Sequence, residues 1–91
     1  MSDSALAAPL GTTIRQMRET RGWSQELLAE KADLNRSYVG ELERGKVLAS
    51  VLTLEKLARA FGFSAAHLIS QAELLASYRH VRGLQLTAIA C

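Results

Sequence analysis

The sequence has few of the features that mark secreted or membrane proteins. Its one cysteine cannot form an internal disulfide, which is typical of a protein from a reducing compartment. No apolar run approaches the roughly 20 residues that a transmembrane helix needs. Met1–Leu10 contains an aspartate but no lysine or arginine, so it lacks the pattern of a secretory signal. We therefore expect a cytoplasmic protein with no membrane partner.

Groupings typical of enzymes and metal sites are also missing. His67 and His80 are far apart in the chain and have no cysteine nearby, while Cys91 is terminal. The sequence has no metal-ligand spacing, phosphate-binding loop or Ser/His/Asp arrangement. We interpret the histidines and Cys91 as surface groups, and we expect no enzyme activity, no metal and no cofactor.

What is present is the composition of one small globular domain. The 91 residues are 48% hydrophobic and 22% charged, which is enough for a single core of marginal size. The net charge of +2 comes from 11 basic and 9 acidic residues. A sum this small argues neither for nor against a polyanionic partner, so the positions of the charges must decide.

Apolar spacing and capping residues predict an all-α fold of four or five short helices. With a single proline and six glycines, turns must be few. Met1–Gly11 shows no periodicity and is predicted to be a flexible N-terminal arm. Thr12 and Thr13 would cap the first helix, and Gly22 would end it.

Four further helices each follow a short polar residue that can accept a hydrogen bond in the first turn. These capping residues are Ser24, Asn35, Ser50 and Ser64. The last helix meets no glycine or proline until Gly83, which predicts a length of about 18 residues. The apolar segment Leu84–Cys91 stays unassigned. The result is a compact helical domain whose C-terminal helix is longer than the others.

The segment from Trp23 to Gly45 indicates a function. It contains two helices of about eight residues, joined by a turn of three or four, and the second begins with short polar side chains and Arg36. This is the helix-turn-helix arrangement. In that arrangement the first helix crosses the DNA backbone and the second inserts its N-terminal residues into the major groove.

A wider set of residues carries a resemblance to a known family. These residues are Ile14, Arg18, Ser24, Gln25, Glu26, Leu28, Ala29, Leu34, Arg36–Val39, Leu42–Gly45, Leu54, Leu57, Ala58 and Phe61. Together they resemble the Cro and phage-repressor (XRE-type) helix-turn-helix family over residues 14–68. The resemblance implies a five-helix, lambda-repressor-like DNA-binding domain over residues 12–70. The total length and the Arg-Ser-Tyr start of the second motif helix are similar to the controller proteins of restriction–modification systems.

The resemblance also implies which residues contact double-stranded DNA. Base edges would be reached by Arg36, Ser37, Tyr38 and Glu41. Phosphates would be contacted by Ser24, Gln25, Asn35, Arg44 and Lys46. An arginine can bond guanine O6 and N7 together, and a glutamate can accept from cytosine N4. By the same resemblance, Arg18 and Glu43 would form an internal ion pair between the first and third helices.

Some of these roles have open alternatives. Gln25 and Arg36 would otherwise be solvated surface groups, and Glu41 would pair with a neighbouring basic residue. Tyr38 would be half buried against the second helix. Asp33 stands where the family usually has glycine, at a position that often needs positive φ, which aspartate tolerates better than most residues.

Exposed apolar residues predict that two copies of the chain associate. The last helix carries two apolar stripes, one through Leu68, Ala72 and Leu75, the other through Leu74, Tyr78 and Val81. One edge helix cannot bury both within so small a domain. We therefore expect a homodimer, with residues 71–91 as the extension that pairs the copies. The predicted interface residues are Leu48, Val51, Leu52, Leu68, Leu75 and Tyr78.

The predicted function is a sequence-specific transcription regulator that binds a palindromic operator as a homodimer. The alternative is an antitoxin or another helical protein-interaction module, with DNA binding secondary. A monomer with its tail folded over the stripes would also account for the apolar surface. No small-molecule ligand is expected, because too little chain lies outside the DNA-binding domain to enclose a pocket for one.

Overall fold

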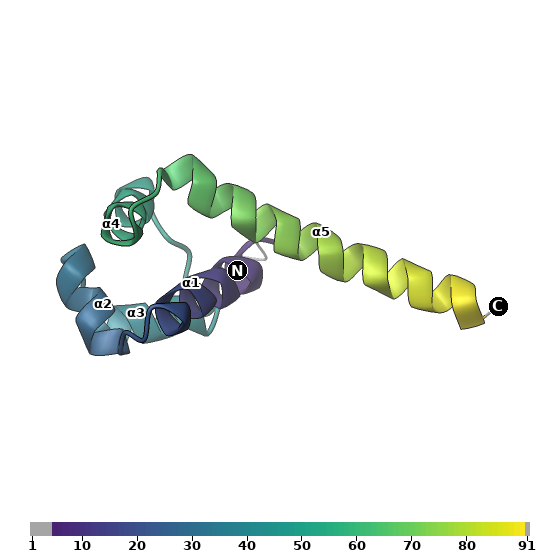
Figure 1. The fold of residues 1–91 in the computed structure, drawn as a ribbon, viewed down its shortest axis with the longest axis horizontal. Helices are drawn as coiled ribbons and strands as arrows, with labels where there is room; N and C mark the ends of the chain where they lie inside the picture. The colour runs from purple at the N-terminus through teal and green to yellow at the C-terminus, as the bar shows by residue number, and fades with distance from the viewer. Residues whose placement is uncertain (1–4, 91) are drawn as a thin grey trace.

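The computed structural model describes residues 5–90, and their side chains from residue 5 to residue 78. Within this part of the chain there are five helices and no strand, which confirms the predicted all-α fold (Figure 1). The helices are α1 (Ala7–Thr20), α2 (Gln25–Ala32), α3 (Arg36–Glu43), α4 (Val51–Phe61) and α5 (Ala65–Ala90). Helices α1 to α4 and the first half of α5 surround one core, beyond which the C-terminal part of α5 extends (Figure 1).

The first helix begins earlier than predicted. It starts at Ala7 without a side-chain cap, and Pro9, Leu10 and Gly11 are buried. Thr13 lies inside the helix, where its hydroxyl donates to the carbonyl of Pro9 at 2.8 Å instead of capping the N-terminus. Pro9 is tolerated because first-turn N–H groups have no partner within the helix. The predicted arm is therefore wrong for residues 7–11, while residues 1–4 lie outside the described part.

Helices α2 to α5 begin directly after the capping residues that the sequence indicates. Backbone N–H groups two or three residues further along donate to the side chains of Ser24, Asn35, Ser50 and Ser64. The turn between α2 and α3 contains Asp33 with φ of 56°, the left-handed conformation expected at that position. Lys56 of α4 stabilises this turn, because its ammonium donates to the Asp33 carbonyl at 3.2 Å.

The last helix does not end at Gly83. It continues to Ala90, a total of 26 residues, so the prediction of about 18 was too short. One glycine costs a helix only about 1 kcal/mol relative to alanine, which is too little to end it without a proline or a cap. Residues 84–90 therefore belong to α5. The side chains of Val81 and His80, and all of Cys91, lie outside the described part.

The two apolar stripes of α5 have different surroundings. Leu68 and Ala72 are fully buried in the core with residues of the other four helices, whereas Leu74 is 61% exposed. Leu68 is therefore unavailable to a second copy, and its assignment to the dimer interface was wrong. The reason is that Leu68 lies on the face of α5 that covers the core. Leu75 is half-buried and Tyr78 is exposed.

Helices α1 and α3 lie in close backbone contact at Gly11. A Cβ atom at this position would lie 2.3 Å from the carbonyl oxygen of Leu42 and 2.7 Å from that of Glu43. Both atoms are backbone, so a side chain here would push the helices apart. The absence of a side chain at Gly11 is what lets α1 lie directly on the end of α3.

We predict that Gly11→Ala lowers the free energy of unfolding by about 1–3 kcal/mol, the usual cost of overpacking a core. Gly40→Ala in α3 is the matched control. Its Cβ would meet only movable side-chain ends, with Arg44 Nη1 at 3.1 Å, and alanine favours a helix. Urea unfolding followed by circular dichroism measures both. Equal effects of the two substitutions would contradict this account of the helix crossing.

Candidate nucleic-acid interface

The start of α3 presents polar side chains to solvent. Asn35 caps the helix by accepting from the Ser37 N–H at 2.8 Å, which fixes the direction in which the first turn leaves the loop. Asn35, Arg36 and Ser37 are all exposed, and Glu41 is exposed one turn further along. The structure thus brings three of the four predicted base-reading residues onto the exposed side of one short helix.

The fourth of these residues, Tyr38, is placed differently. Its side chain is half-buried, and its hydroxyl lies 3.3 Å from the hydroxyl of Thr53. Thr53 belongs to α4 and also accepts a bond from Ser50 at 3.0 Å. Tyr38 thus has its polar partner on α4, and its partial burial agrees with the alternative of a half-buried ring. This packing leaves less of Tyr38 to reach a base than of Arg36 or Ser37.

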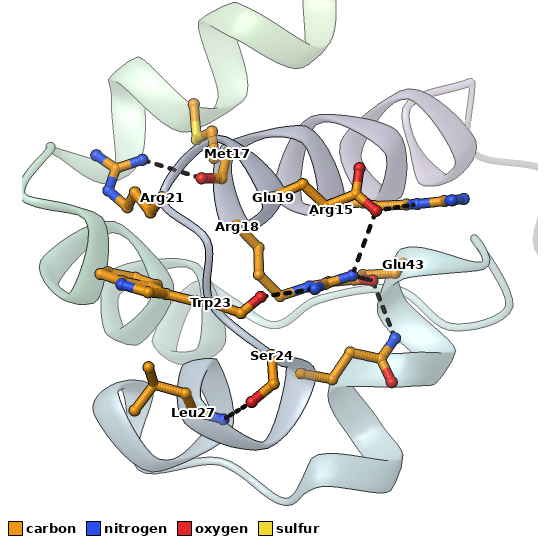
Figure 2. A network of polar contacts seen from close by, with 10 residues as sticks. Arg15, Met17, Arg18, Glu19, Arg21, Trp23, Ser24, Leu27 and Glu43 are labelled. Carbon is orange, nitrogen blue, oxygen red and sulfur yellow. Dashed lines mark hydrogen bonds and ion pairs between the residues drawn. The ribbon is translucent and has the colours of Figure 1, made fainter.

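A polar network centred on Glu43 connects α3 to its neighbouring helices (Figure 2). Arg18 Nε donates to Glu43 Oε2 at 2.6 Å, and Arg18 Nη2 donates to Oε1 at 3.0 Å. Gln25 Nε2 donates to the same Oε1 at 3.0 Å. Arg18 also donates to the Trp23 carbonyl at 2.8 Å. The network therefore connects α1, the start of α2 and the end of α3, and it contains the ion pair that the resemblance implied.

The ion pair between Arg18 and Glu43 is largely shielded from solvent. The side chain of Glu43 is 3% exposed and that of Arg18 is 12% exposed. The hydrogen bond from Arg18 to Glu43 raises the pKa of the guanidinium above its ordinary value, against the opposing effect of burial. The two-point geometry is the one in which arginine binds carboxylate most strongly.

Gln25 donates one hydrogen bond within the network, and its carboxamide has other hydrogen-bonding groups that Glu43 does not use. A carboxamide has two N–H groups and one carbonyl oxygen, and only one N–H is used by Glu43. The side chain lies at the first position of α2 and is half-buried. Arg44 lines the same cleft as Gln25. Arg44 and Lys46 are exposed just past the end of α3, and Ser24 is exposed at the cap of α2.

The network opens onto a polar cleft of about 220 Å³ between α1, α2 and α3. Its lining residues are Arg15, Arg18, Glu19, Gln25, Glu43 and Arg44. Arg15 and Glu19 were not predicted to belong to the site. Their four-residue spacing does predict a helical ion pair, and the structure contains one of 3.2 Å. Only the packing of α1 on α2 and α3 shows that this pair lines the same cleft as Gln25 and Arg44.

A second exposed surface is apolar and lies outside this cleft. Leu48 is 52% exposed, Val51 is 70% exposed and Leu52 is 60% exposed. They lie in the loop before α4 and in its first turn. On α5, Tyr78 is 58% exposed. We call Leu48, Val51 and Leu52 the apolar loop patch.

The described residues contain no group of three or more His, Cys, Asp or Glu side chains that could hold a metal ion. In the same part of the chain, no helix combines the length and the apolar character that crossing a membrane requires.

Comparison with known proteins gives consistent matches. The model of the family described as HTH_3, helix-turn-helix, matches residues 14–68. The immunity repressor protein of Bacillus phage phi105 is 36% identical over 66 residues, covering 72% of this chain and 46% of the repressor. This chain spans only 30 to 60% of the length of four curated relatives that it matches.

Two solved structures are similar over most of the chain. The restriction-modification controller protein C.AhdI from Aeromonas hydrophila is 40% identical with a TM-score of 0.65, covering 69% of this chain and 94% of that one. The clp gene regulator ClgR from Corynebacterium glutamicum is 26% identical with a TM-score of 0.82. That similarity covers 92% of this chain and 89% of ClgR. These matches confirm the predicted resemblance and the helical fold.

We predict that Glu43→Gln lowers the free energy of unfolding by about 3 kcal/mol, because it leaves the Arg18 guanidinium buried without its counter-ion. Glu19→Gln is the control, since it removes the same charge from an exposed pair and is expected to cost less than about 1 kcal/mol. Denaturant unfolding measures both variants. A loss for Glu43→Gln no larger than for the control would contradict the structural role of the network.

Proposed function

The chain belongs to the HTH_3 helix-turn-helix family, whose model matches residues 14–68, and we propose that it regulates transcription by binding an operator in double-stranded DNA. Relatives of this chain are named as transcriptional regulators and as a repressor, not as enzymes, which supports this proposal. In this function, α2 would cross the DNA backbone and the start of α3 would enter the major groove. A cytoplasmic location is part of the same proposal.

The proposal rests on the exposed start of α3, a helix whose far end is bonded to α1 and α2. Arg36 and Ser37 are exposed in the first turn, where side chains of a recognition helix contact bases. The Glu43 network fixes the far end of the same helix to α1 and α2. Arg36 would bond guanine through O6 and N7, and Glu41, one turn later, would accept from cytosine N4.

Phosphate contacts would orient the domain on the duplex. Gln25 has a free N–H at the start of α2, where the positive end of the helix also attracts anions. Arg44 and Lys46 are exposed past the end of α3 and would contact the backbone next to the groove. Ser24 and Asn35 would add contacts from the two exposed caps.

We predict that Arg36→Ala weakens binding about 10-fold or more to a duplex recovered by selection from a random pool, because a bidentate base contact is lost. Binding to an unrelated duplex should weaken far less. Arg59→Ala on α4 is the control, because it removes the same charge from another exposed position. Fluorescence anisotropy measures the affinities of the unmodified chain and of both variants for each duplex. If Arg36→Ala changes neither affinity more than Arg59→Ala does, the proposed base contact is wrong.

We further infer that the operator is bound by a homodimer. The exposed cations at the start and end of α3 are few, so one copy provides only modest attraction to DNA. The apolar loop patch, together with Leu75 and Tyr78 on α5, gives a second copy an apolar surface to cover. A twofold dimer would place two copies of α3 one DNA turn apart, about 34 Å, on a palindromic site.

We predict that Val51→Glu shifts the chain from dimer to monomer, because it places a charge at the centre of an apolar interface. Sedimentation equilibrium measures the mass without DNA. Ser37→Glu is the matched control, since it adds the same charge on the proposed DNA face, where it should abolish DNA binding and leave the dimer intact. If the unmodified chain is a monomer, or if Val51→Glu remains dimeric, this interface is wrong. A monomer would favour the alternative of a protein-interaction module whose apolar loop patch contacts another protein.

A further inference from the structure

The cleft between α1, α2 and α3 contains two glutamates in very different situations. The buried Glu43 accepts three hydrogen bonds, two from Arg18 and one from Gln25. Its charge is therefore fully used within the fold. The side chain of Glu19, by contrast, is 53% exposed. Nothing in the packing of the fold requires its carboxylate.

Glu19 directs this carboxylate at two guanidinium groups (Figure 2). Its Oε2 lies 3.2 Å from Arg15 Nε and 4.0 Å from Arg18 Nη2. The side chain of Arg15 is 63% exposed, so this pair meets solvent at the rim of the cleft. The same cleft is lined by Gln25 and Arg44, which carry the proposed phosphate contacts.

A carboxylate and a phosphate are recognised by arginine in the same way. Both offer two anionic oxygens to the planar N–H groups of a guanidinium. Arg18 uses only three of its five N–H groups, on Glu43 and on the Trp23 carbonyl. A phosphate that reaches Gln25 therefore meets a cleft where Arg15 and Arg18 are already faced by an internal anion.

We propose that Glu19 holds, in the free protein, the position that a DNA phosphate takes on Arg15 and Arg18 in the complex. This inference rests on the proposed function. Arg15 is then a further phosphate-contact residue, and Glu19 is a built-in competitor that lowers the affinity for every DNA sequence alike. The exchange is easy because an exposed ion pair contributes little to stability and is readily broken. Weak nonspecific binding would leave discrimination to the base contacts of α3.

The test compares Glu19→Gln with the unmodified chain on two duplexes, one recovered by selection and one of unrelated sequence. Glu19→Gln is expected to tighten binding to both by about 3- to 10-fold, and to steepen the plot of log affinity against log salt by up to about one unit. Glu73→Gln is the control, because it makes the same change in net charge at an exposed position on α5, outside the cleft. It is expected to change affinity less than twofold.

Arg15→Ala, alone and with Glu19→Gln, tests whether the gain comes from the freed arginine. In the Glu19→Gln background, Arg15→Ala is expected to remove most of the gain in DNA affinity. In the otherwise unmodified chain, Arg15→Ala is expected to lower the DNA affinity much less. Thermal unfolding of each variant checks that the fold is retained.

The inference is overturned if Glu19→Gln binds no tighter than Glu73→Gln, or if its gain persists without Arg15. A gain confined to the selected duplex would also contradict it, because a phosphate contact does not depend on sequence. If the unmodified chain binds neither duplex, the proposed function itself fails. Binding by the unmodified chain with no gain in Glu19→Gln refutes only the role given to Glu19.

Discussion

The structure depends on one buried carboxylate. Glu43 stands at the end of α3 and accepts hydrogen bonds from Arg18 of α1 and from Gln25 of α2. Three short helices that would be marginal alone are joined at this point. Since Gly11 lets the backbone of α1 lie against the same end of α3, the contact is both polar and closely packed. The direction in which the exposed start of α3 points is a consequence of both.

This arrangement separates two kinds of surface. The polar cleft and the first turn of α3 carry the groups suited to phosphates and base edges, whereas the apolar loop patch lies at the start of α4. The proposed contacts with DNA and the proposed contacts between two copies therefore use different residues. Within the polar cleft, the arginines would attract a phosphate, and the carboxylate of Glu19 lies close to two of them.

Local signals predicted most of the fold. The capping residues Ser24 and Asn35 act within three positions of themselves, and Asp33 was expected in the left-handed region that it occupies. The start of α1 was missed because it has no capping side chain and is stabilised by contacts with distant α3. Leu68 was misplaced because a helical stripe does not indicate which face covers the core. The resemblance implied the Arg18–Glu43 pair, but the cleft that adds Arg15 and Glu19 exists only once three helices pack together.

The start of α3 and the cleft beside it are the proposed surface for DNA. Titrating the isotope-labelled chain with a selected duplex, and following the backbone amide resonances by NMR, tests this directly. The largest shifts are predicted at Gln25, at residues 35–38 and at residues 44–46, with smaller changes along α4. Shifts concentrated in the apolar loop patch or α5, with none at residues 35–38, would contradict the account.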